Sequence, residues 1–475
     1  MNLNQTLQEK YPHLEVSVLK LSEVKKNIDF RIDDSFWTMK LIYNNKLNYK
    51  KIGECLLKSQ YGISINMNEE GDGVPIYRMN DIDNMLCNFE VKKYALIDKN
   101  ELQTFRLNYG DVLFNRTNSY EFVGRTGIFY NNRENFVFAS YLVRLVCNKE
   151  ILLPEYLTVF LNTHIGKKEI RRRARPSINQ TNVNPEELKE IKIPIFPMEF
   201  QLEIQNLVKD SHKALEESKE LYKKAEETLY LELGLDPKNP LQSLLDSKID
   251  HSIKSLNISI RTLKESFLKT GRLDSEYYQS KYEDIEKFIK SYPNGYDSFS
   301  SIINNKDTNF TPKNNENYSY IELANIGNNG NISEPISDLG KNLPTRARRI
   351  VSKGDVIISS IEGSLSSCAL ITQEFDKHLV STGFFVLNSK LLNGETLLVM
   401  FKSQIFQEYL KKFPSGTILC AINKEELSKI LIPKIDSTTQ EKIAKYIQES
   451  FNLRKKSKQL LDNAKIKVEE QIQGK

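Results

Sequence analysis

The chain repeats part of its own sequence at an interval of about half its length. Residues 193–204 read "IPIFPMEFQLEI" and residues 432–443 read "IPKIDSTTQEKI"; each begins with Ile-Pro and carries a glutamine eight residues later, Gln201 and Gln440. At the resulting offset of 239 residues, segments 184–225 and 423–464 share 14 identities in 42 positions. These identities include the irregular pattern NxEELxxIxIP, which shared helical composition does not explain. The sequence therefore predicts an internal duplication.

Further matches lie upstream, at slightly different offsets. "FRIDDSFW" at residues 30–37 matches "GRLDSEYY" at 271–278, and Gly-Asp-Val recurs at 110–112 and 354–356. A changing offset indicates insertions and deletions between the matching segments, so the two copies keep one frame while the intervening stretches diverge. Asp436 departs from the repeat, because the first copy has Pro197 at that position.

The two glutamine segments each lead into a long charged stretch with apolar or small residues stepped by four and three. Such stepping over about four heptads is typical of a coiled coil, and the preceding prolines predict where each helix begins. An antiparallel pair within the chain is the favoured interpretation, and a partner on the outer face of the helices stays open. The expected spacer-helix core consists of Ile204, Val208, Leu215, Tyr222, Leu229, Ile443, Ile447, Leu461 and Val468.

Between the long helices, short segments rich in β-branched and aromatic residues are bounded by turn residues, and they alternate with helical stretches. The expected fold class is α+β, with two α/β domains in tandem, separated by two long antiparallel coiled-coil-like helices, with pseudo-two-fold symmetry. The expected boundaries are 1–195 for the first domain, 196–236 for the central helix, 237–434 for a linker and the second domain, and 435–475 for the C-terminal helix.

Composition and motifs exclude several classes of function but do not by themselves indicate one. The five cysteines are scattered singly, which favours a reducing cytoplasm, and neither a signal peptide nor an apolar run of about 18 residues indicates secretion or a membrane. The chain has no phosphate-binding GxxxxGK[ST] loop, no GxGxxG fingerprint, no HExxH and no paired Cys/His spacing. The net charge of +5 permits a nucleic-acid partner without arguing for one. The sequence therefore predicts a binding protein and no metal site.

Polar and basic segments at equivalent positions of the two copies are the candidates for binding duplex DNA. "RRRARPSINQTN" at 171–182 precedes the first repeat frame, and "KKFPSGTILCAIN" at 411–423 precedes the second. Arginine and lysine neutralise phosphates, whereas Asn, Gln, Ser and Thr reach base edges or the sugar–phosphate backbone. The residues expected at DNA are Arg78, Asn80, Asn115, Arg116, Asn118, Arg171, Arg172, Arg173, Arg175, Asn179 and Gln180 in the first copy, and Arg346, Arg348, Arg349, Ser359, Ser360, Lys411, Lys412, Ser415 and Thr417 in the second.

Plainer interpretations of these segments remain possible. The arginine run fits a solvated basic helix end, and "NRTNSYEFVGRTG" at 115–127 fits a turn with ordinary polar residues. Recurrence at equivalent positions favours DNA contact. Since Asn115 and Arg116 correspond to Ser359 and Ser360, the two copies are expected to read different bases.

The repeated Ile-Pro…Gln helix starts, "GRLDSEYY" and "GDVLFNRTNSYEFVGRTG" together resemble the specificity subunit of type I restriction–modification systems, over nearly the whole chain. The resemblance implies two domains that each read half of a bipartite DNA sequence. It also implies partners: two methyltransferase subunits and the restriction (translocase–nuclease) subunits. Catalysis would belong to these partners, so that S-adenosylmethionine, ATP and Mg²⁺ are expected there and no cofactor in this chain.

Elementary geometry is compatible with that expectation. A helix over residues 198–233 would be about 50 Å long, against about 34–36 Å between DNA half-sites one turn apart. Two alternatives stay open: the specificity component of a related restriction or methylation defence system, and a coiled-coil scaffold that binds proteins. A methyltransferase is disfavoured because no NPPY-type tetrapeptide occurs.

Overall fold

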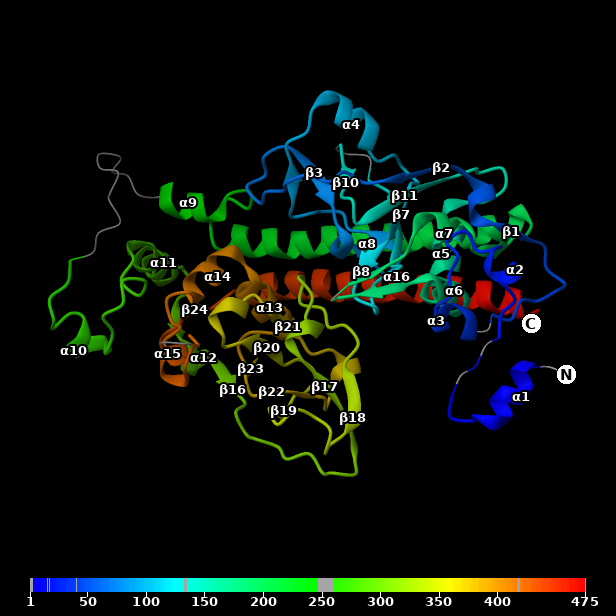
Figure 1. Cartoon of the computed structure of the whole chain (residues 1–475). Coiled ribbons are helices and arrows are strands. Elements are labelled where there is room, and N and C mark those ends of the chain that lie inside the picture. The colour runs from blue at the N-terminus through cyan, green and yellow to red at the C-terminus, as the bar shows by residue number, and fades with distance from the viewer. Residues whose placement is uncertain are drawn as a thin grey trace. The chain divides into compact units, whose positions relative to one another are not determined.

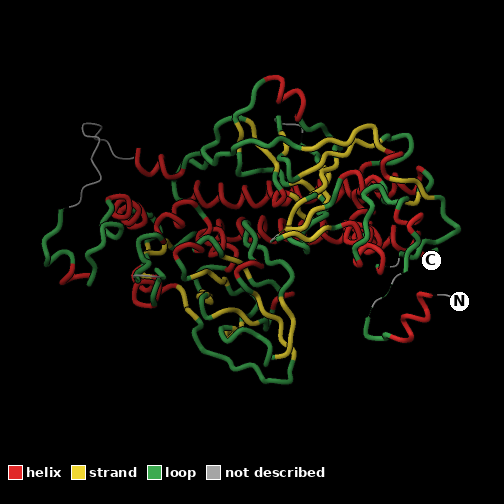
Figure 2. The backbone as a smooth tube through the Cα atoms, in the orientation of Figure 1, coloured by secondary structure: helices red, strands yellow, loops and turns green. Residues whose placement is uncertain are grey.

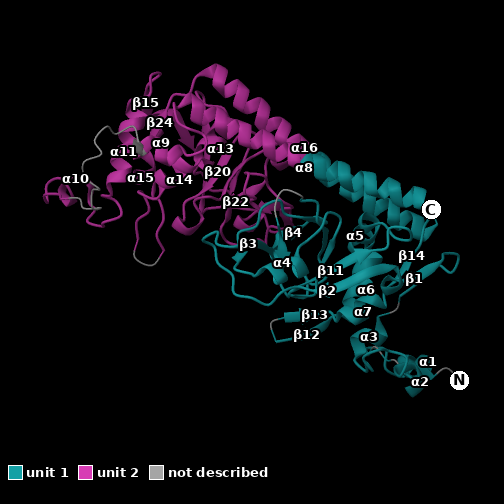
Figure 3. Ribbon diagram, turned by 90° about the horizontal axis from the view of Figure 1, so that it is seen from above, with its two compact units in different colours: residues 1–215, 455–475 teal, residues 216–454 magenta. Residues whose placement is uncertain are grey.

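The computed structural model describes residues 3–14, 16, 18–39, 41–131, 135–178, 180–246, 260–416 and 419–474 (Figure 1). The chain forms two compact units (Figure 3). Unit 1 contains residues 1–215 and 455–475, and unit 2 contains residues 216–454. The two long helices α8 (Met198–Glu232) and α16 (Ser437–Gln473) each contribute one part to either unit. The sequence set these helices apart as segments of their own, whereas in the structure each helical half packs into the core of a unit.

The centre of unit 1 is a six-stranded, mostly antiparallel sheet with the strand order β2-β11-β7-β9-β5-β4. Figure 2 shows strands in yellow and helices in red. Its strands are β2 (Leu56–Tyr61), β4 (Ile82–Asp83), β5 (Leu86–Cys87), β7 (Val112–Asn115), β9 (Thr126–Ile128) and β11 (Leu142–Cys147). The helix α5 (Pro154–Asn162) packs against β9. Leu152, Leu157 and Phe160 are buried there with Phe114 and Val143 of the sheet, so burial of apolar surface holds this layer together.

Smaller sheets and helices surround this layer. One sheet has the order β10-β3-β6, one β12-β13-β8, and β1 pairs with β14. The other elements of unit 1 are α1 (Leu3–Lys10), α2 (Leu21–Val24), α3 (Asp34–Thr38), β1 (Tyr49–Lys51), η1 (Ile52–Cys55), β3 (Val74–Tyr77), η2 (Met79–Asp81), β6 (Tyr94–Ala95), α4 (Lys99–Phe105), β8 (Thr117–Asn118), β10 (Val137–Phe138), α6 (His164–Arg173), β12 (Arg175–Ser177), β13 (Gln180–Asn182), α7 (Pro185–Lys189) and β14 (Lys192–Pro194).

Unit 2 has two four-stranded sheets, ordered β16-β23-β20-β21 and β18-β17-β22-β19, and the pair β15-β24. Its elements are α9 (Pro240–Asp246), α10 (Phe267–Thr270), α11 (Ser280–Lys290), β15 (Tyr296–Ser298), α12 (Phe299–Ile302), β16 (Ile303–Asn305), β17 (Asn317–Ile321), η3 (Leu323–Asn325), β18 (Ile336–Leu339), β19 (Ala347–Ile350), β20 (Val356–Ser359), η4 (Glu362–Ser364), β21 (Cys368–Leu370), η5 (Gln373–Phe375), β22 (Leu379–Ser381), β23 (Phe384–Ser389), α13 (Gly394–Lys402), α14 (Gln404–Leu410), α15 (Lys424–Lys429) and β24 (Leu431–Pro433).

Four strands of the central sheets repeat one order, β2-β11-β7-β9 in unit 1 and β16-β23-β20-β21 in unit 2, and a strand pair within them has the same register. In unit 1 Leu142 of β11 lies opposite Asn115 of β7, and in unit 2 Phe384 of β23 lies opposite Ser359 of β20. The two helices that follow β11, α5 and α6, correspond to α13 and α14 after β23. The duplication and the α+β class predicted from the sequence are therefore present in the fold.

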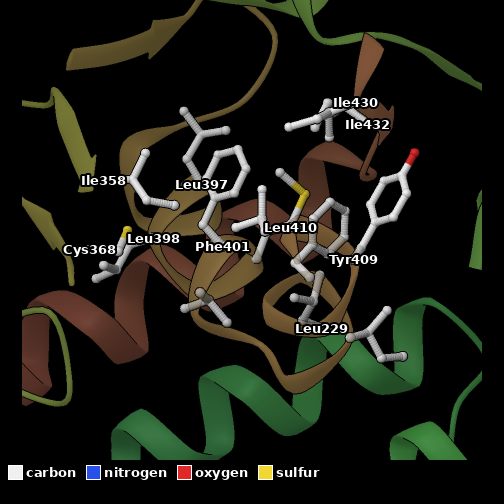
Figure 4. Close-up of a cluster of buried hydrophobic side chains, with 14 of the residues drawn as sticks. Leu229, Ile358, Cys368, Leu397, Leu398, Phe401, Tyr409, Leu410, Ile430 and Ile432 are labelled. Carbon is white, nitrogen blue, oxygen red and sulfur yellow. The ribbon is translucent and has the colours of Figure 1, made fainter. Parts of the chain in front are cut away.

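The core of unit 2 shows how these elements pack (Figure 4). Apolar side chains of α13 and α14, among them Leu397, Phe401 and Tyr409, meet Ile358 of β20 and Leu229 of α8. Each of these five side chains is buried, and burial of a large apolar side chain stabilises the fold by about 1.5–3 kcal/mol. The end of α8 is therefore part of the unit 2 core.

The long helices run antiparallel, as two serine pairs show. In unit 1 the Oγ atoms of Ser211 and Ser457 lie 2.8 Å apart, and in unit 2 those of Ser218 and Ser450 lie 3.0 Å apart. All four serines are buried, and their small side chains allow the two backbones to approach closely. The two pairs are equivalent under the 239-residue offset.

The residues expected at the core of these helices fall into the two units. Ile204, Val208, Leu461 and Val468 are buried in the core of unit 1, against which Leu215 is partly buried. Tyr222, Leu229, Ile443 and Ile447 are buried in the core of unit 2. Each helical half is thus fixed to its own unit by its apolar face.

The repeated glutamines fasten the start of each helix to the domain before it. Gln201 accepts a hydrogen bond from the Leu153 N–H (2.9 Å) and donates to the carbonyls of Ile151 and Phe196 (3.1 and 3.0 Å). Gln440 makes the equivalent three bonds, to the Asn393 N–H (2.9 Å) and to the carbonyls of two further residues, Leu391 and Ile435. Both side chains are buried, so their polar groups need these partners. This need explains why the glutamine recurs.

Asp436, where the second copy departs from the repeat, caps the start of α16. Its carboxylate accepts hydrogen bonds from the backbone N–H groups of Thr438 (2.8 Å) and Thr439 (3.3 Å), so it caps the first turn of α16. A proline such as Pro197 has no side-chain acceptor and instead restricts the backbone where the helix begins. The two copies therefore begin their long helices differently, with a proline in the first and a capping aspartate in the second.

None of the helices in the described ranges is long and apolar enough to cross a membrane.

Candidate nucleic-acid interface

Two polar segments that are far apart in the sequence of unit 1 meet in one small sheet. Strand β13 pairs with β12 on one side and with β8 on the other, so that Thr181 lies opposite Asn118 and Asn182 opposite Thr117. The hydroxyl of Thr117 also donates to the Asn182 side chain (2.6 Å). The hairpin of residues 175–182 and the segment 115–125 therefore form a continuous polar structure, which we call the unit 1 loop platform. The hairpin strands β12 and β13 are labelled in Figure 3.

Arginine side chains lie over aromatic rings on this platform. The Arg125 guanidinium is 4.0 Å from the ring centroid of Phe122, and that of Arg116 is 5.1 Å from Tyr61. All three of Tyr61, Phe122 and Tyr120 keep 41% or more of their surface exposed. An exposed cation–π pair contributes about 0.5–1 kcal/mol and holds the guanidinium in a defined direction. Aromatic faces and oriented arginines suit stacking on bases and pairing with phosphates.

Two arginines at the end of α6, just before the platform, are bound to other parts of the protein. Arg173 is buried, forms an ion pair with Glu169 and donates to the Glu169 carbonyl (3.2 Å). Arg172 donates through Nε to the Phe36 carbonyl (2.7 Å) and lies 4.3 Å over the ring of that residue. Burial, with Arg173 as a like-charged neighbour, lowers the pKa of Arg172. These two arginines support the base of the platform.

The remaining expected residues of unit 1 have a range of environments. Arg171 is exposed, with its guanidinium 5.8 Å from the Tyr120 ring, and Gln180 is exposed at the start of β13. Arg175 pairs with Asp29 and, at 3.4 Å, with Glu187. Asn118 is half-buried within β8, and Asn179 lies outside the described residues.

Two expected residues hold the framework of the platform. Asn115 is fully buried; it donates to the Phe122 carbonyl (3.3 Å) and accepts from the Thr117 N–H (3.3 Å), which shapes the loop. Arg116 donates to the Ser140 carbonyl (3.1 Å). Arg78 and Asn80 lie apart in sequence, around η2, where Arg78 is 3.9 Å from Asp81 and Asn80 is exposed.

Unit 2 builds the equivalent structure from different residues. Ala421 bridges to both Ser415 and Ile361, and the Ile422 N–H donates to the Ser360 carbonyl (2.8 Å). In unit 1 the Val183 N–H makes the matching bond to the Arg116 carbonyl (2.9 Å). The backbone arrangement is therefore shared. We call residues 359–364 and 411–422 the unit 2 loop platform, of which Thr417 and residue 418 lie outside the described residues.

The expected residues of unit 2 are also divided between surface and framework. Ser359 is buried and pairs with Ser364 (2.8 Å), and Ser360 donates to the Gly383 carbonyl (2.9 Å). Lys411 is exposed and pairs with Glu408 (2.7 Å), whereas Lys412 pairs with Glu286 and lies over the Tyr277 ring. Ser415, Arg346 and Arg348 are exposed, and burial lowers the pKa of the half-buried Arg349.

An arginine and a nearby aspartate tie each platform to the segment before it. The Arg31 guanidinium makes two hydrogen bonds of 2.7 Å to Asp33 and donates to the carbonyls of Arg173 (2.9 Å) and Ala174 (3.4 Å). Arg272 bonds in the same way to Asp274 (2.7 and 3.0 Å) and to the carbonyls of Phe413 (3.2 Å) and Pro414 (2.7 Å). Bidentate pairs of this kind are geometrically specific. We call each one an arginine clasp.

Sequence reasoning missed the aromatic side of the unit 1 platform, formed by Tyr61, Tyr120, Phe122, Tyr141 and the neighbouring Arg125. Tyr120, Phe122 and Arg125 stand within the quoted segment 115–127, where alternation of aromatic and basic residues was an available signal. Tyr61 and Tyr141 carry no such signal, because they come to the platform through the pairing of β11 with β2 and with β7. In the part of the chain that the structure describes, no cluster of three or more His, Cys, Asp or Glu side chains could hold a metal ion.

Comparison with known proteins matches residues 49–227 to the family model for the type I restriction modification DNA specificity domain. A relative described as the putative type I restriction enzyme MjaX specificity subunit of Methanocaldococcus jannaschii is 22% identical over 88% of this chain and 91% of its own length. The type I restriction enzyme EcoKI specificity subunit of Escherichia coli is 27% identical over 34% of either chain.

Among solved structures, the type I restriction-modification system S subunit from M. genitalium aligns over 90% of this chain and 96% of its own, with a TM-score of 0.42 and 14% identity. The HsdS subunit from Thermoanaerobacter tengcongensis aligns over 91% and 98%, with a TM-score of 0.30 and 12% identity. The matched domain and the relative that spans most of the chain agree with the resemblance predicted from the sequence: residues 49–227 match a DNA specificity domain of type I restriction–modification systems, and the whole chain is similar to a specificity subunit of such a system.

Proposed function

We propose that this chain reads a bipartite, asymmetric duplex DNA sequence for a type I restriction–modification complex, with one half-site read by each loop platform. The observation that carries the proposal is that the two units share a backbone arrangement at the platforms but present different side chains. Arg116 of unit 1 and Ser360 of unit 2 make the same backbone contact, for example, and differ in charge and reach. Shared framework with divergent polar residues is what two readers of different sequences require.

The platforms combine two kinds of DNA contact. The exposed guanidinium of Arg171 suits a phosphate, and Gln180 at the start of the hairpin carries an amide that pairs with base edges. The half-buried Arg172 and the buried Arg173 position these side chains from below. The two long helices, of which α8 extends over 35 residues, or about 50 Å, set the number of base pairs left unread between the half-sites.

In this proposal the chain performs no chemistry itself. Two methyltransferase subunits modify the DNA, restriction (translocase–nuclease) subunits cut it, and S-adenosylmethionine, ATP and Mg²⁺ act in those partners. The complex works in the cytoplasm, where the host DNA is. The isolated cysteines support a reducing compartment, since Cys55, Cys87, Cys147 and Cys368 are buried as free thiols.

Methylome sequencing tests this function directly. A host that lacks other methyltransferases would express the chain together with the methyltransferase subunit of the same system. We expect one new modified motif with two different specific halves and a fixed unread spacer. A contiguous or palindromic motif would contradict the assignment of one half-site to each unit.

The salt dependence of DNA binding distinguishes this function from that of a protein-binding scaffold. The purified chain should bind duplex DNA with an affinity that falls steeply and linearly on a plot of log K against log salt, because phosphate contacts release counterions. A scaffold would bind its partner without such a slope and would leave duplex DNA unbound at low salt.

A further inference from the structure

Each arginine clasp holds one apolar side chain outward, in both units. Between Arg31 and Asp33 stands Ile32, which is 82% exposed, and between Arg272 and Asp274 stands Leu273, which is 69% exposed. Single exposed apolar residues are ordinary on protein surfaces. Ile32 and Leu273 differ from such residues because the hydrogen bonds and ring contacts around them recur in both units.

The contacts around the two side chains correspond in three respects. Asp33 caps the Phe36 N–H (3.2 Å), as Asp274 caps that of Tyr277 (3.1 Å). The Trp37 Nε1–H donates to the Arg31 carbonyl (2.8 Å), and the hydroxyl of Tyr278 donates to the Arg272 carbonyl (3.0 Å). The two guanidinium groups lie 4.8 and 4.7 Å over the rings of Phe36 and Tyr277. The polar groups are used internally, and the residue between Arg and Asp is left facing solvent.

The backbone before the clasp is unusual in the same way in both copies. Phe30 has φ +53° and Gly271 has φ +72°. Glycine adopts this left-handed conformation freely, whereas a bulky residue such as phenylalanine pays a strain of about 1–2 kcal/mol. Retention of the turn in unit 1 despite that cost indicates that the direction of the following residue matters.

We propose that Ile32 and Leu273 are twin docking knobs, each of which inserts into an apolar pocket on one methyltransferase subunit, so that one methyltransferase binds per unit. This inference rests on the proposed function and adds to it the surface that does the docking. Two equal knobs on one chain call for a partner that is present in two identical copies. Base reading does not explain two equal knobs, because the two loop platforms present different side chains.

The carboxylates beside each knob are mostly paired within the chain. Asp33 and Asp274 bind the arginines of their clasps, and Glu276 lies 3.4 Å from Lys281, so these groups add little net charge around Ile32 and Leu273. The partner pocket is therefore matched to the apolar side chain rather than to a charge.

The test uses the full chain and the purified methyltransferase subunit of its system, with stoichiometry from light scattering and affinity from calorimetry. Wild-type chain should bind two copies. Ile32→Ser or Leu273→Ser alone should leave one tight site and weaken the other by about tenfold or more, as expected for a central apolar anchor, and the double variant should weaken both. All variants should unfold at the wild-type urea midpoint, because the changed side chains are exposed.

Matched controls are Leu57→Ser in unit 1 and Leu231→Ser in unit 2, which alter side chains that are 71% and 66% exposed outside the clasps. Both should bind two methyltransferase subunits with wild-type affinity. If wild-type chain binds no methyltransferase, the proposed function fails. If it binds two copies and the double knob variant binds them equally well, the function stands and the docking knobs are wrong.

Two further outcomes would also overturn the inference. Loss of duplex DNA affinity in the knob variants, with methyltransferase binding unchanged, would make the side chains DNA wedges of the kind that insert between base steps. Dimerisation of wild-type chain by itself, abolished by the double variant with methyltransferase binding intact, would make a second copy of this chain the occupant.

Discussion

Three consecutive arginines, Arg171 to Arg173, have three different environments. Arg171 is exposed near Tyr120, Arg172 leans on Phe36, and Arg173 is buried against Glu169. Helical geometry causes the difference, since successive side chains of α6 point about 100° apart. One arginine therefore faces the candidate DNA surface while its neighbours support the platform.

Substitution of Arg171 should affect DNA binding, whereas substitution of Arg173 should affect stability. Arg171→Ala should weaken duplex DNA binding by similar factors for all sequences and lower the salt slope by about one, with stability unchanged. Arg173→Ala should lower the free energy of unfolding by about 3–5 kcal/mol, because Glu169 would keep a buried, unpaired charge. Urea unfolding and fluorescence titration of a labelled duplex measure the two quantities. Wild-type stability of Arg173→Ala would contradict the structural role.

The clasp in unit 1 should make stability depend on acid pH. Burial alone would raise the pKa of Asp33, but hydrogen bonds from Arg31 and Ser35 outweigh it and lower that pKa from 3.8 to about 2. A lowered carboxylate pKa contributes stability above the unfolded value, and this contribution is lost as the pH falls from about 4 to about 2. The stability difference between wild type and Asp33→Asn, measured by urea unfolding, should therefore be constant above about pH 5 and shrink toward about pH 2. An unchanged difference at the acid end of this range would show that the charge of Asp33 is unimportant.

The sequence alone identifies the basic cluster, but it does not show which arginines are exposed and which are buried. The sequence shows Arg173 beside two other arginines, whereas its burial depends on Tyr43 and Glu169 coming together from segments 126 residues apart. Likewise Asn115 was a reasonable candidate for base contact, and its full burial follows from the way residues 115–125 fold back. Whether such a residue is buried depends on contacts between segments that are distant in the sequence, and sequence patterns do not predict these contacts.

At the scale of elements, the repeated helix starts were the most predictable part of the fold. Spacing and proline positions predicted helices that the structure begins at Met198 and Ser437. The reason for the repeated glutamine could not be predicted, because its partners, Leu153 and Asn393, belong to helix ends in the preceding domain. The glutamine joins two elements rather than serving its own helix.

Removal of one such glutamine should loosen the helix from its domain. Gln440→Met keeps the approximate volume but leaves the Asn393 N–H and the carbonyls of Leu391 and Ile435 without this partner, at a cost of about 2–4 kcal/mol in the free energy of unfolding. The matched control is Gln448→Met on the same helix, where an exposed glutamine makes one bond to Glu395. Urea unfolding compares the two variants, and equal midpoints would refute the anchoring role.

At the scale of the whole molecule, the duplication is legible in the amino-acid sequence alone. The repeat predicted two copies of one fold, and strand register proves equal in both, down to the pairs Asn115–Leu142 and Ser359–Phe384. The stretches between the matching segments share too little identity to be aligned residue by residue. The equivalence of the two loop platforms is therefore carried by their backbone hydrogen bonds rather than by their side chains.

Exchange of one reader should change one half of the recognised motif. A chimera that takes residues 30–180 from a family member of different specificity should methylate a motif whose first half is new and whose second half and spacer are retained. The reciprocal chimera, with residues 271–419 exchanged, is the matched control and should change the other half. Methylome sequencing reads both results. An unchanged motif in either chimera would contradict the assignment of one half-site to each unit.

The composition of unit 1 bears on how the protein is made. Its core includes Leu461, Ala464, Val468 and Ile472, and the Asn44 side chain donates to the Ile472 carbonyl (3.0 Å). During synthesis, unit 2 is contiguous in the chain and can form as soon as it leaves the ribosome, whereas unit 1 must wait for residues that are made only after the whole of unit 2. Premature termination of translation therefore leaves the first reader incomplete. A truncated product with one finished reader and one unfinished reader would expose apolar surface to proteases instead of accumulating as a half-specific DNA-binding protein.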